Sequence, residues 1–109
     1  LDLSVLDALV GNDAAKFRKF ALLFISSMET VLSQVDAAAA QQDMATLGAM
    51  GHRAKSTALN IGATAFSRQC LLLEQTARAN NVDEATAIAN GLRPMFTAVC
   101  QAINQRLEG

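Results

Sequence analysis

The sequence predicts an all-α fold: an antiparallel, up-down-up-down four-helix bundle with a short extra helix at its N-terminus. Hydrophobic residues make up 51% of the 109 residues but aromatic residues only 5%, so much of the apolar content is alanine and aliphatic side chains, which favours helix. No segment alternates apolar and polar residues over a useful length, as strands do. The connections between the long predicted helices are short, which makes sequential helices antiparallel.

The first two helices are predicted from their capping residues. A short helix is expected over Leu3–Val10, with Asp2 as its N-cap and Gly11 as its terminator. Asn12-Asp13 then caps a long helix that runs to about Ala40. Apolar residues three and four positions apart form the stripe that this helix should turn toward the core: Phe17, Phe20, Phe24, Met28, Val31 and Val35.

The third and fourth helices are separated by a glycine. Asp43 is a natural cap for the third helix, which reaches Ile61 before Gly62 ends it. The fourth helix is expected over Ala63–Ala79. Its core side is predicted to consist of Phe66, Cys70, Leu73 and Ala77.

The last helix follows a turn at Asn80-Asn81-Val82 and is predicted to begin at Asp83 as its cap and to end near Leu107. Gly91 and Pro94 interrupt it, so we expect a kink there. The side chains that it offers to the core are Ile88, Leu92, Phe96, Val99 and Ile103.

Composition and length narrow the class of protein. One domain over residues 1–109 is expected, because the chain is near the usual size of a single domain. A formal charge of −1 gives no sign of a surface for nucleic acid or for an anionic membrane, and we find no apolar run long enough to cross a bilayer. Cys70 and Cys100 lack CxxC spacing and fall within apolar helical patterns, so we interpret them as buried, reduced thiols.

The only histidine, His52, falls on the predicted solvent face of the third helix. At ~100° per residue, Leu47, Met50, Ala54, Ala58 and Ile61 cluster on the opposite side and should contact the core. The residues that share its face are mostly small: Ala45, Gly48, Ala49, Lys55, Ser56 and Leu59. Gly48 should point outward, so that a partner's backbone can approach, and Gly51 should point toward a neighbouring helix. Composition alone also allows a neutral, alanine-rich surface with an incidental histidine.

The residue types around His52 favour phosphoryl transfer. An imidazole is largely unprotonated and nucleophilic near neutral pH, and Lys55, one turn on, can hold a phosphoryl oxygen as a point charge. Ser56 can add a hydroxyl donor. Positioning and charge neutralisation supply most of the catalysis in such reactions. We therefore predict that His52 carries a phosphoryl group between proteins.

Other kinds of site fit the sequence less well. A metal site needs several clustered ligands, and one histidine with two separated cysteines does not supply them. A haem ligand would point into the core, whereas His52 is predicted to point away from it. A hydrolase needs an orienting acidic group, and no acidic residue lies on the face of His52. A helical docking module that binds a receiver or another partner without phosphoryl transfer remains the alternative.

The stretch from His52 to Ala63 resembles the histidine-containing phosphotransfer (HPt) domain family. It has a histidine, a lysine three residues later, a small residue, and an apolar-glycine-alanine helix end. The segments 70–74 and 77–78 are similar to the next helix of the family, with its leucine–glutamate pair. The cap at Asp43 and the long helix before it also fit. Many members have glycine after the lysine, where this chain has Ser56.

The resemblance implies a role for each matching residue. His52 would accept a phosphoryl group from a receiver-domain aspartate and pass it to another receiver, and Lys55 would stabilise the phosphate. Arg78 stands where some members carry a basic residue near the site. Together with Arg78, the residues expected to meet the partner are Ala45, Gly48, Ala49, Ser56 and Leu59.

The resemblance also implies the setting of the domain. No cofactor is expected in the chain, and Mg²⁺ would be held by the receiver partner. Ala54 stands where a P-loop needs glycine, so the chain would be a phosphoryl carrier without a nucleotide site rather than an enzyme. The partners would be response-regulator receiver domains, with no nucleic acid and no direct membrane contact. We expect a cytoplasmic monomer that forms the C-terminal HPt domain of a hybrid sensor histidine kinase, which can itself be membrane-anchored. A free-standing carrier is the alternative that the sequence leaves open.

Overall fold

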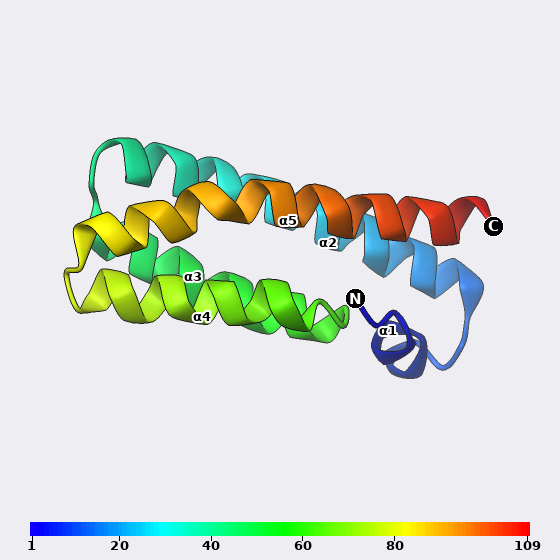
Figure 1. The fold of residues 1–109 in the computed structure, drawn as a ribbon. Helices are drawn as coiled ribbons and strands as arrows, with labels where there is room; N and C mark the ends of the chain where they lie inside the picture. The colour runs from blue at the N-terminus through cyan, green and yellow to red at the C-terminus, as the bar shows by residue number, and fades with distance from the viewer.

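The computed structural model describes all 109 residues and contains five helices. They are α1 (Ser4–Leu9), α2 (Ala14–Ala40), α3 (Met44–Asn60), α4 (Thr64–Arg78) and α5 (Val82–Glu108). Helices α2 to α5 run alternately up and down along an elongated bundle, and α1 lies at the end where α2 begins and α3 ends (Figure 1). This arrangement confirms the predicted four-helix bundle with a short N-terminal helix.

Helices α2 and α3 begin at the side-chain caps that the sequence predicts. The Asp13 carboxylate accepts a hydrogen bond from the backbone N of Lys16, and that of Asp43 accepts one from the backbone N of Thr46, each at 3.1 Å. The Thr46 hydroxyl and backbone N–H together hold the pKa of Asp43 below its usual value. The predicted cap of α5 is wrong: the N-cap is Asn81. Asp83 lies in the first helical turn, where a negative charge still favours the helix dipole.

The last helix is continuous through Gly91 and Pro94, the two residues at which a kink is expected. Val82–Glu108 is a single α-helix that includes Pro94. Proline removes one backbone hydrogen bond to the carbonyl four residues earlier. That carbonyl belongs to Asn90, an exposed residue.

The core contains most of the predicted apolar stripes, with one clear exception. Phe20 is 47% exposed because it lies on the side of α2 that faces α1, which covers it incompletely. Met50 and Ile88 are only partly buried against the core. Cys70 is buried and Cys100 half-buried, and burial raises the pKa of the Cys70 thiol to about 12.

Helix α2 combines the length and hydropathy of a membrane span with a role in the core. Its most apolar window has a mean hydropathy of 1.2. By length and composition α2 could therefore cross a membrane, contrary to the expectation that the chain has no apolar run of that length. Length and composition are weak evidence here, because a core helix meets the same criterion. The buried residues of α2 are Phe17, Ala21, Phe24, Met28, Val31, Leu32, Val35, Ala38 and Ala39.

The N-terminal segment contacts two other parts of the chain at one end of the bundle, the turn after α3 and the end of α5. The backbone N of Asp2 donates to the carbonyl oxygen of Gly62 at 2.9 Å. A Cβ at Gly62 would lie 1.8 Å from the Asp2 carbonyl oxygen, and Gly62 has a φ of +79°, so glycine is required at this turn. Farther along, the Asp7 carboxylate binds the guanidinium of Arg106 at 2.6 Å. These contacts hold α1 beside the end of α3.

Candidate functional site

His52 lies on the exposed face of α3, as predicted. Its side chain is 61% exposed, and Ala45, Ala49, Ser56 and Leu59 are exposed with it. The residues predicted on the opposite side are buried, apart from the partly buried Met50: Leu47, Ala54, Ala58 and Ile61. A nucleophile at His52 is therefore accessible to another protein.

A buried carboxylate from α4 joins three functional side chains. Glu74 is 4% exposed, and its Oε2 lies 2.7 Å from Nδ1 of His52. Its Oε1 accepts a hydrogen bond from Nζ of Lys55 at 2.5 Å. One turn farther along α4, Nη1 of Arg78 forms an ion pair with Oε2 at 2.7 Å. Glu74 thus organises His52, Lys55 and Arg78 into one charged cluster.

The positive charges around Glu74 favour its ionised form. The Lys55 ammonium makes the largest contribution to holding the pKa of Glu74 below its usual value, against the opposing effect of burial, and His52 and Arg78 lower it further. An ionised Glu74 can only accept hydrogen bonds. We therefore assign the proton of a neutral His52 to Nδ1, which donates to Glu74. The lone pair then remains on Nε2.

Gly51 lets α4 come close enough for Glu74 to reach His52. A Cβ at position 51 would lie 2.6 Å from the carbonyl oxygen of Cys70 and 2.8 Å from the backbone N of Glu74. Any side chain there would push the backbone of α4 away. The prediction that Gly51 faces a neighbouring helix is confirmed, and the site depends on this close approach.

Gly48 does not lie on the open face, which corrects the prediction made from the helical wheel. It is buried, and a Cβ there would lie 3.3 Å from Cγ of Arg78. The stem of Arg78 crosses Gly48 on its way to Glu74. The absence of a side chain at Gly48 therefore accommodates Arg78 and does not open the approach to His52.

A second polar contact joins the two helices beside the site. The hydroxyl of Ser67, a buried residue of α4, donates to the carbonyl oxygen of Lys55 at 2.7 Å. That carbonyl lies within α3, so α4 is fixed along α3 at Lys55 as well as at Gly51. The contacts at Lys55 and at Gly51 together determine the position of Glu74 relative to His52.

No acidic residue of α3 shares the face of His52, as expected, but Glu74 reaches His52 from α4, which a helical wheel of α3 alone does not show. The sequence signal for Glu74 was its place in the buried stripe of α4, four residues after Cys70 and three before Ala77. A buried carboxylate requires a partner. The orienting acid of a hydrolase is therefore present, but no serine or cysteine side chain forms a hydrogen bond with His52.

No group of three or more His, Cys, Asp or Glu side chains is arranged to hold a metal ion. His52 is directed to the surface and its Nδ1 is already bonded to Glu74. The polar chemistry of this site therefore consists of an exposed imidazole and the charged groups behind it.

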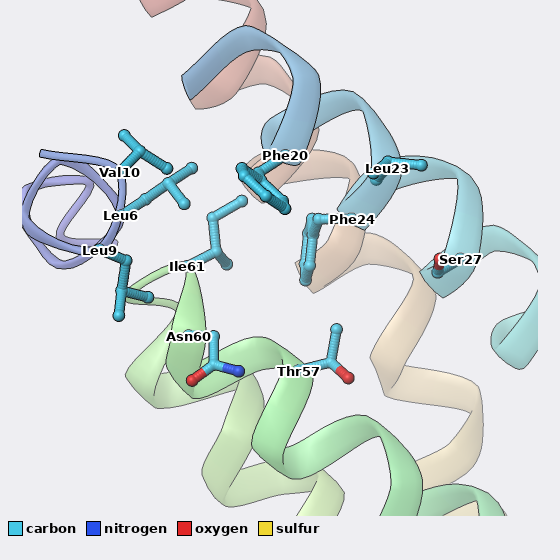
Figure 2. Close-up of a pocket in the computed structure, with 10 residues that line it drawn as sticks. All are labelled: Leu6, Leu9, Val10, Phe20, Leu23, Phe24, Ser27, Thr57, Asn60 and Ile61. Carbon is cyan, nitrogen blue, oxygen red and sulfur yellow. The ribbon is translucent and has the colours of Figure 1, made fainter. Parts of the chain in front are cut away.

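An apolar groove that the sequence analysis did not predict lies between α1, α2 and the end of α3 (Figure 2). Its volume is about 370 Å³. Leu9, Phe20 and Leu23 are 63%, 47% and 50% exposed. Thr57 and Asn60, five and eight residues after His52 on α3, form its near edge. The remaining lining residues are Leu6, Val10, Phe24, Ser27 and Ile61. Exposed apolar side chains such as these are available to contribute buried area when a partner docks.

Comparisons with known proteins agree with this geometry. The sequence profile of the Hpt domain matches residues 19–105. The crystal structure of histidine-containing phosphotransfer protein B from Pseudomonas aeruginosa superimposes with a TM-score of 0.91 at 25% identity, over 99% of this chain and 94% of that chain. No curated protein sequence matches the chain significantly. The chain therefore belongs to the Hpt domain family and is a histidine phosphotransfer carrier of two-component phosphorelay signalling.

Proposed function

We propose that His52 is the residue that carries the phosphoryl group and that Nε2 is the atom that binds it. The observation that supports this assignment is the 2.7 Å contact between Nδ1 and the buried Glu74 carboxylate. This contact keeps the proton on Nδ1 and the lone pair on Nε2. His52 is also the only histidine of the chain and is accessible from solvent.

The proposed transfer requires no proton to leave the histidine. The Nε2 lone pair attacks phosphorus of an aspartyl phosphate on the receiver domain. The N–P bond forms as the P–O bond to aspartate breaks, and the aspartate carboxylate leaves with the bonding electron pair. The product ring carries a positive charge, with hydrogen on Nδ1, and Glu74 stabilises it. The reverse steps pass the group to a second receiver.

Lys55 and Arg78 would supply positive charge beside the reacting group. Both contact Glu74 in this structure, and their flexible side chains can also reach a phosphoryl group on the adjacent histidine. Mg²⁺ and the acidic residues that bind it would belong to the receiver. The chain would have no nucleotide site of its own, so the phosphoryl group must originate from another protein.

The receiver would dock on the face around His52 and extend over the apolar groove. Ala45, Ala49 and Ser56 have short side chains that allow close approach to the imidazole. The exposed apolar residues Leu9, Phe20 and Leu23 would contribute buried area on docking. We further propose that the domain is cytoplasmic and that it is a monomer, because His52 must remain accessible to the receiver.

The experiment that tests this function is transfer of radiolabelled phosphate from phosphorylated receiver domains to the chain and to His52→Gln. We expect acid-labile, alkali-stable label on the wild type alone. Circular dichroism should show the same helix content in both proteins, because His52 is exposed. Label on His52→Gln would contradict the assignment. Receiver binding without label on either protein would favour the alternative, a docking module without phosphoryl transfer.

A further inference from the structure

The exposed charges of α3 and α4 are all positive. Arg53, Arg68 and Arg78 are exposed and Lys55 is half-buried, whereas the only acidic residue of the two helices, Glu74, is buried. Nine of the ten acidic residues of the chain lie outside these helices. The face around His52 is therefore basic although the net charge of the chain is −1.

A groove of about 360 Å³ lies between α3 and α4, and none of its lining residues lines the apolar groove of Figure 2. It combines a cation with apolar surface: Arg68 is exposed, and Leu59 and Leu71 are 51% and 39% exposed. The other lining residues are Lys55, Ser56, Thr64 and Ser67. Lys55 is bound to Glu74, whereas Arg68 forms no ion pair and no side-chain hydrogen bond. Arg68 is thus available to a partner.

Arg68 lies within the area that a docked receiver would cover. It precedes Glu74 by six residues on α4, which corresponds to about 9 Å along the helix axis. A small transient interface buries on the order of 600 Å² on each partner, the area of a disc with a radius of about 14 Å. An interface centred on His52 therefore reaches Arg68, Leu59 and Leu71.

We propose that Arg68, flanked by Leu59 and Leu71, is a specificity-determining contact for the receiver that exchanges phosphoryl groups with His52. Arg68 would pair with a carboxylate at the rim of the receiver's phosphorylation site, while the two leucines exclude water. The apolar groove of Figure 2 contains no charged residue, so it can add affinity but cannot select partners by charge. The α3–α4 groove supplies that selection. This inference rests on the proposed function of His52.

The test compares Arg68→Glu with Arg18→Glu, which changes the net charge equally. Arg18 lines a cavity between α1 and the end of α5, away from the basic face. The donor is the isolated receiver domain that phosphorylates the wild-type chain fastest in a panel charged with labelled acetyl phosphate. For Arg68→Glu we expect kcat/KM for transfer to fall about tenfold at low salt and less than about threefold at 0.5 M NaCl. Arg18→Glu should stay near wild type.

Two further measurements separate docking from chemistry. Labelling of His52 by phosphoramidate, a donor too small to need the groove, should be the same in Arg68→Glu and wild type. Replacing the acidic residues at the receiver's rim by lysine, one at a time, should identify one that restores transfer to Arg68→Glu.

The outcomes distinguish this proposal from the function on which it rests. Equal transfer to Arg68→Glu and wild type would overturn the specificity role and leave the role of His52 intact. Absence of label on the wild type from every receiver would overturn the proposed function itself. If Arg68→Glu altered only self-association in sedimentation, the groove would belong to a contact between copies of this chain, which also contradicts the proposal.

Discussion

Nδ1 of His52 lies 2.7 Å from Oε2 of Glu74, a carboxylate of which only 4% is exposed. The histidine is on α3 and the glutamate on α4, so the imidazole is oriented by the packing of two helices. The exposed histidine and its buried partner have different proposed roles. In the proposed mechanism, His52 contacts the receiver and Glu74 maintains the tautomer that leaves Nε2 reactive.

Replacing Glu74 should slow phosphoryl transfer by an amount that depends on the side chain that takes its place. Gln keeps an oxygen that accepts from Nδ1 but loses the charge, whereas Ala loses both. A hydrogen bond to a charged group contributes about 1.5–3 kcal/mol, so we expect Glu74→Ala to lower kcat of transfer roughly 10- to 100-fold. Glu74→Gln should lie between Ala and wild type. Rapid-quench kinetics measures kcat, and titration should show unchanged receiver affinity. A loss of affinity with constant kcat would contradict the orienting role.

Lys55 and Arg78 should differ in importance although both bind Glu74. The Lys55 side chain is 27% exposed and that of Arg78 is 61% exposed. Exposed ion pairs contribute little, because solvent screens them. We therefore expect Lys55→Ala to reduce the phosphorylation rate several times more than Arg78→Ala, with helix content unchanged in both. Equal reductions of the phosphorylation rate in the two variants, measured with the same receiver, would show that the burial of Lys55 does not increase its contribution to transfer.

Gly51→Ala should damage the fold and the site together. The added Cβ would lie 2.6 Å from the Cys70 carbonyl oxygen, and overpacking of this kind costs about 1–3 kcal/mol. The displaced α4 would also draw Glu74 away from His52 and slow transfer. The matched control is Gly91→Ala, an exposed position in α5 where a Cβ meets nothing within 4 Å. That variant should gain about 0.5–1 kcal/mol. Urea unfolding of both tests the contrast, and equal stabilities would refute the close approach.

The stability contributed by Glu74 should depend on pH with a definite sign. Its pKa is lower in the folded state than in the unfolded chain. Its contribution is therefore complete above the unfolded value of about 4.3 and is lost as pH falls through the lower, folded value. A His52→Gln background leaves Lys55 and Arg78 as the partners of Glu74. The difference in unfolding free energy between Glu74 and Glu74→Gln should shrink from pH 6 to pH 3. A difference that grows on acidification would contradict the sign.

The sequence was sufficient for the helices and for the side of α3 that carries the histidine. Caps and apolar spacing are local properties, so Asp13 and Asp43 identified helix starts correctly. Gly48 and Phe20 were misplaced because a helical wheel describes a helix around its own axis only. It does not show that Arg78 of α4 crosses Gly48 or that α1 leaves Phe20 partly uncovered.

The contact of Glu74 with His52 depends on the distance between α3 and α4, which the sequence indicates only indirectly. Gly51 permits the close approach, and the buried position of Glu74 on α4 indicates a carboxylate that needs partners. Neither signal alone identifies His52 as the partner. The contact between them follows only once the register of α4 against α3 is known, and Ser67 helps to fix that register.

The proposed roles of His52 and Glu74 are tested most directly by phosphorus–nitrogen correlation NMR on the ¹⁵N-labelled, phosphorylated chain. We predict that phosphorus is bonded to Nε2 of His52 and that Nδ1 keeps its proton, because Nδ1 donates a hydrogen bond to Glu74. Phosphorus bonded to Nδ1, or to any residue other than His52, would contradict this prediction.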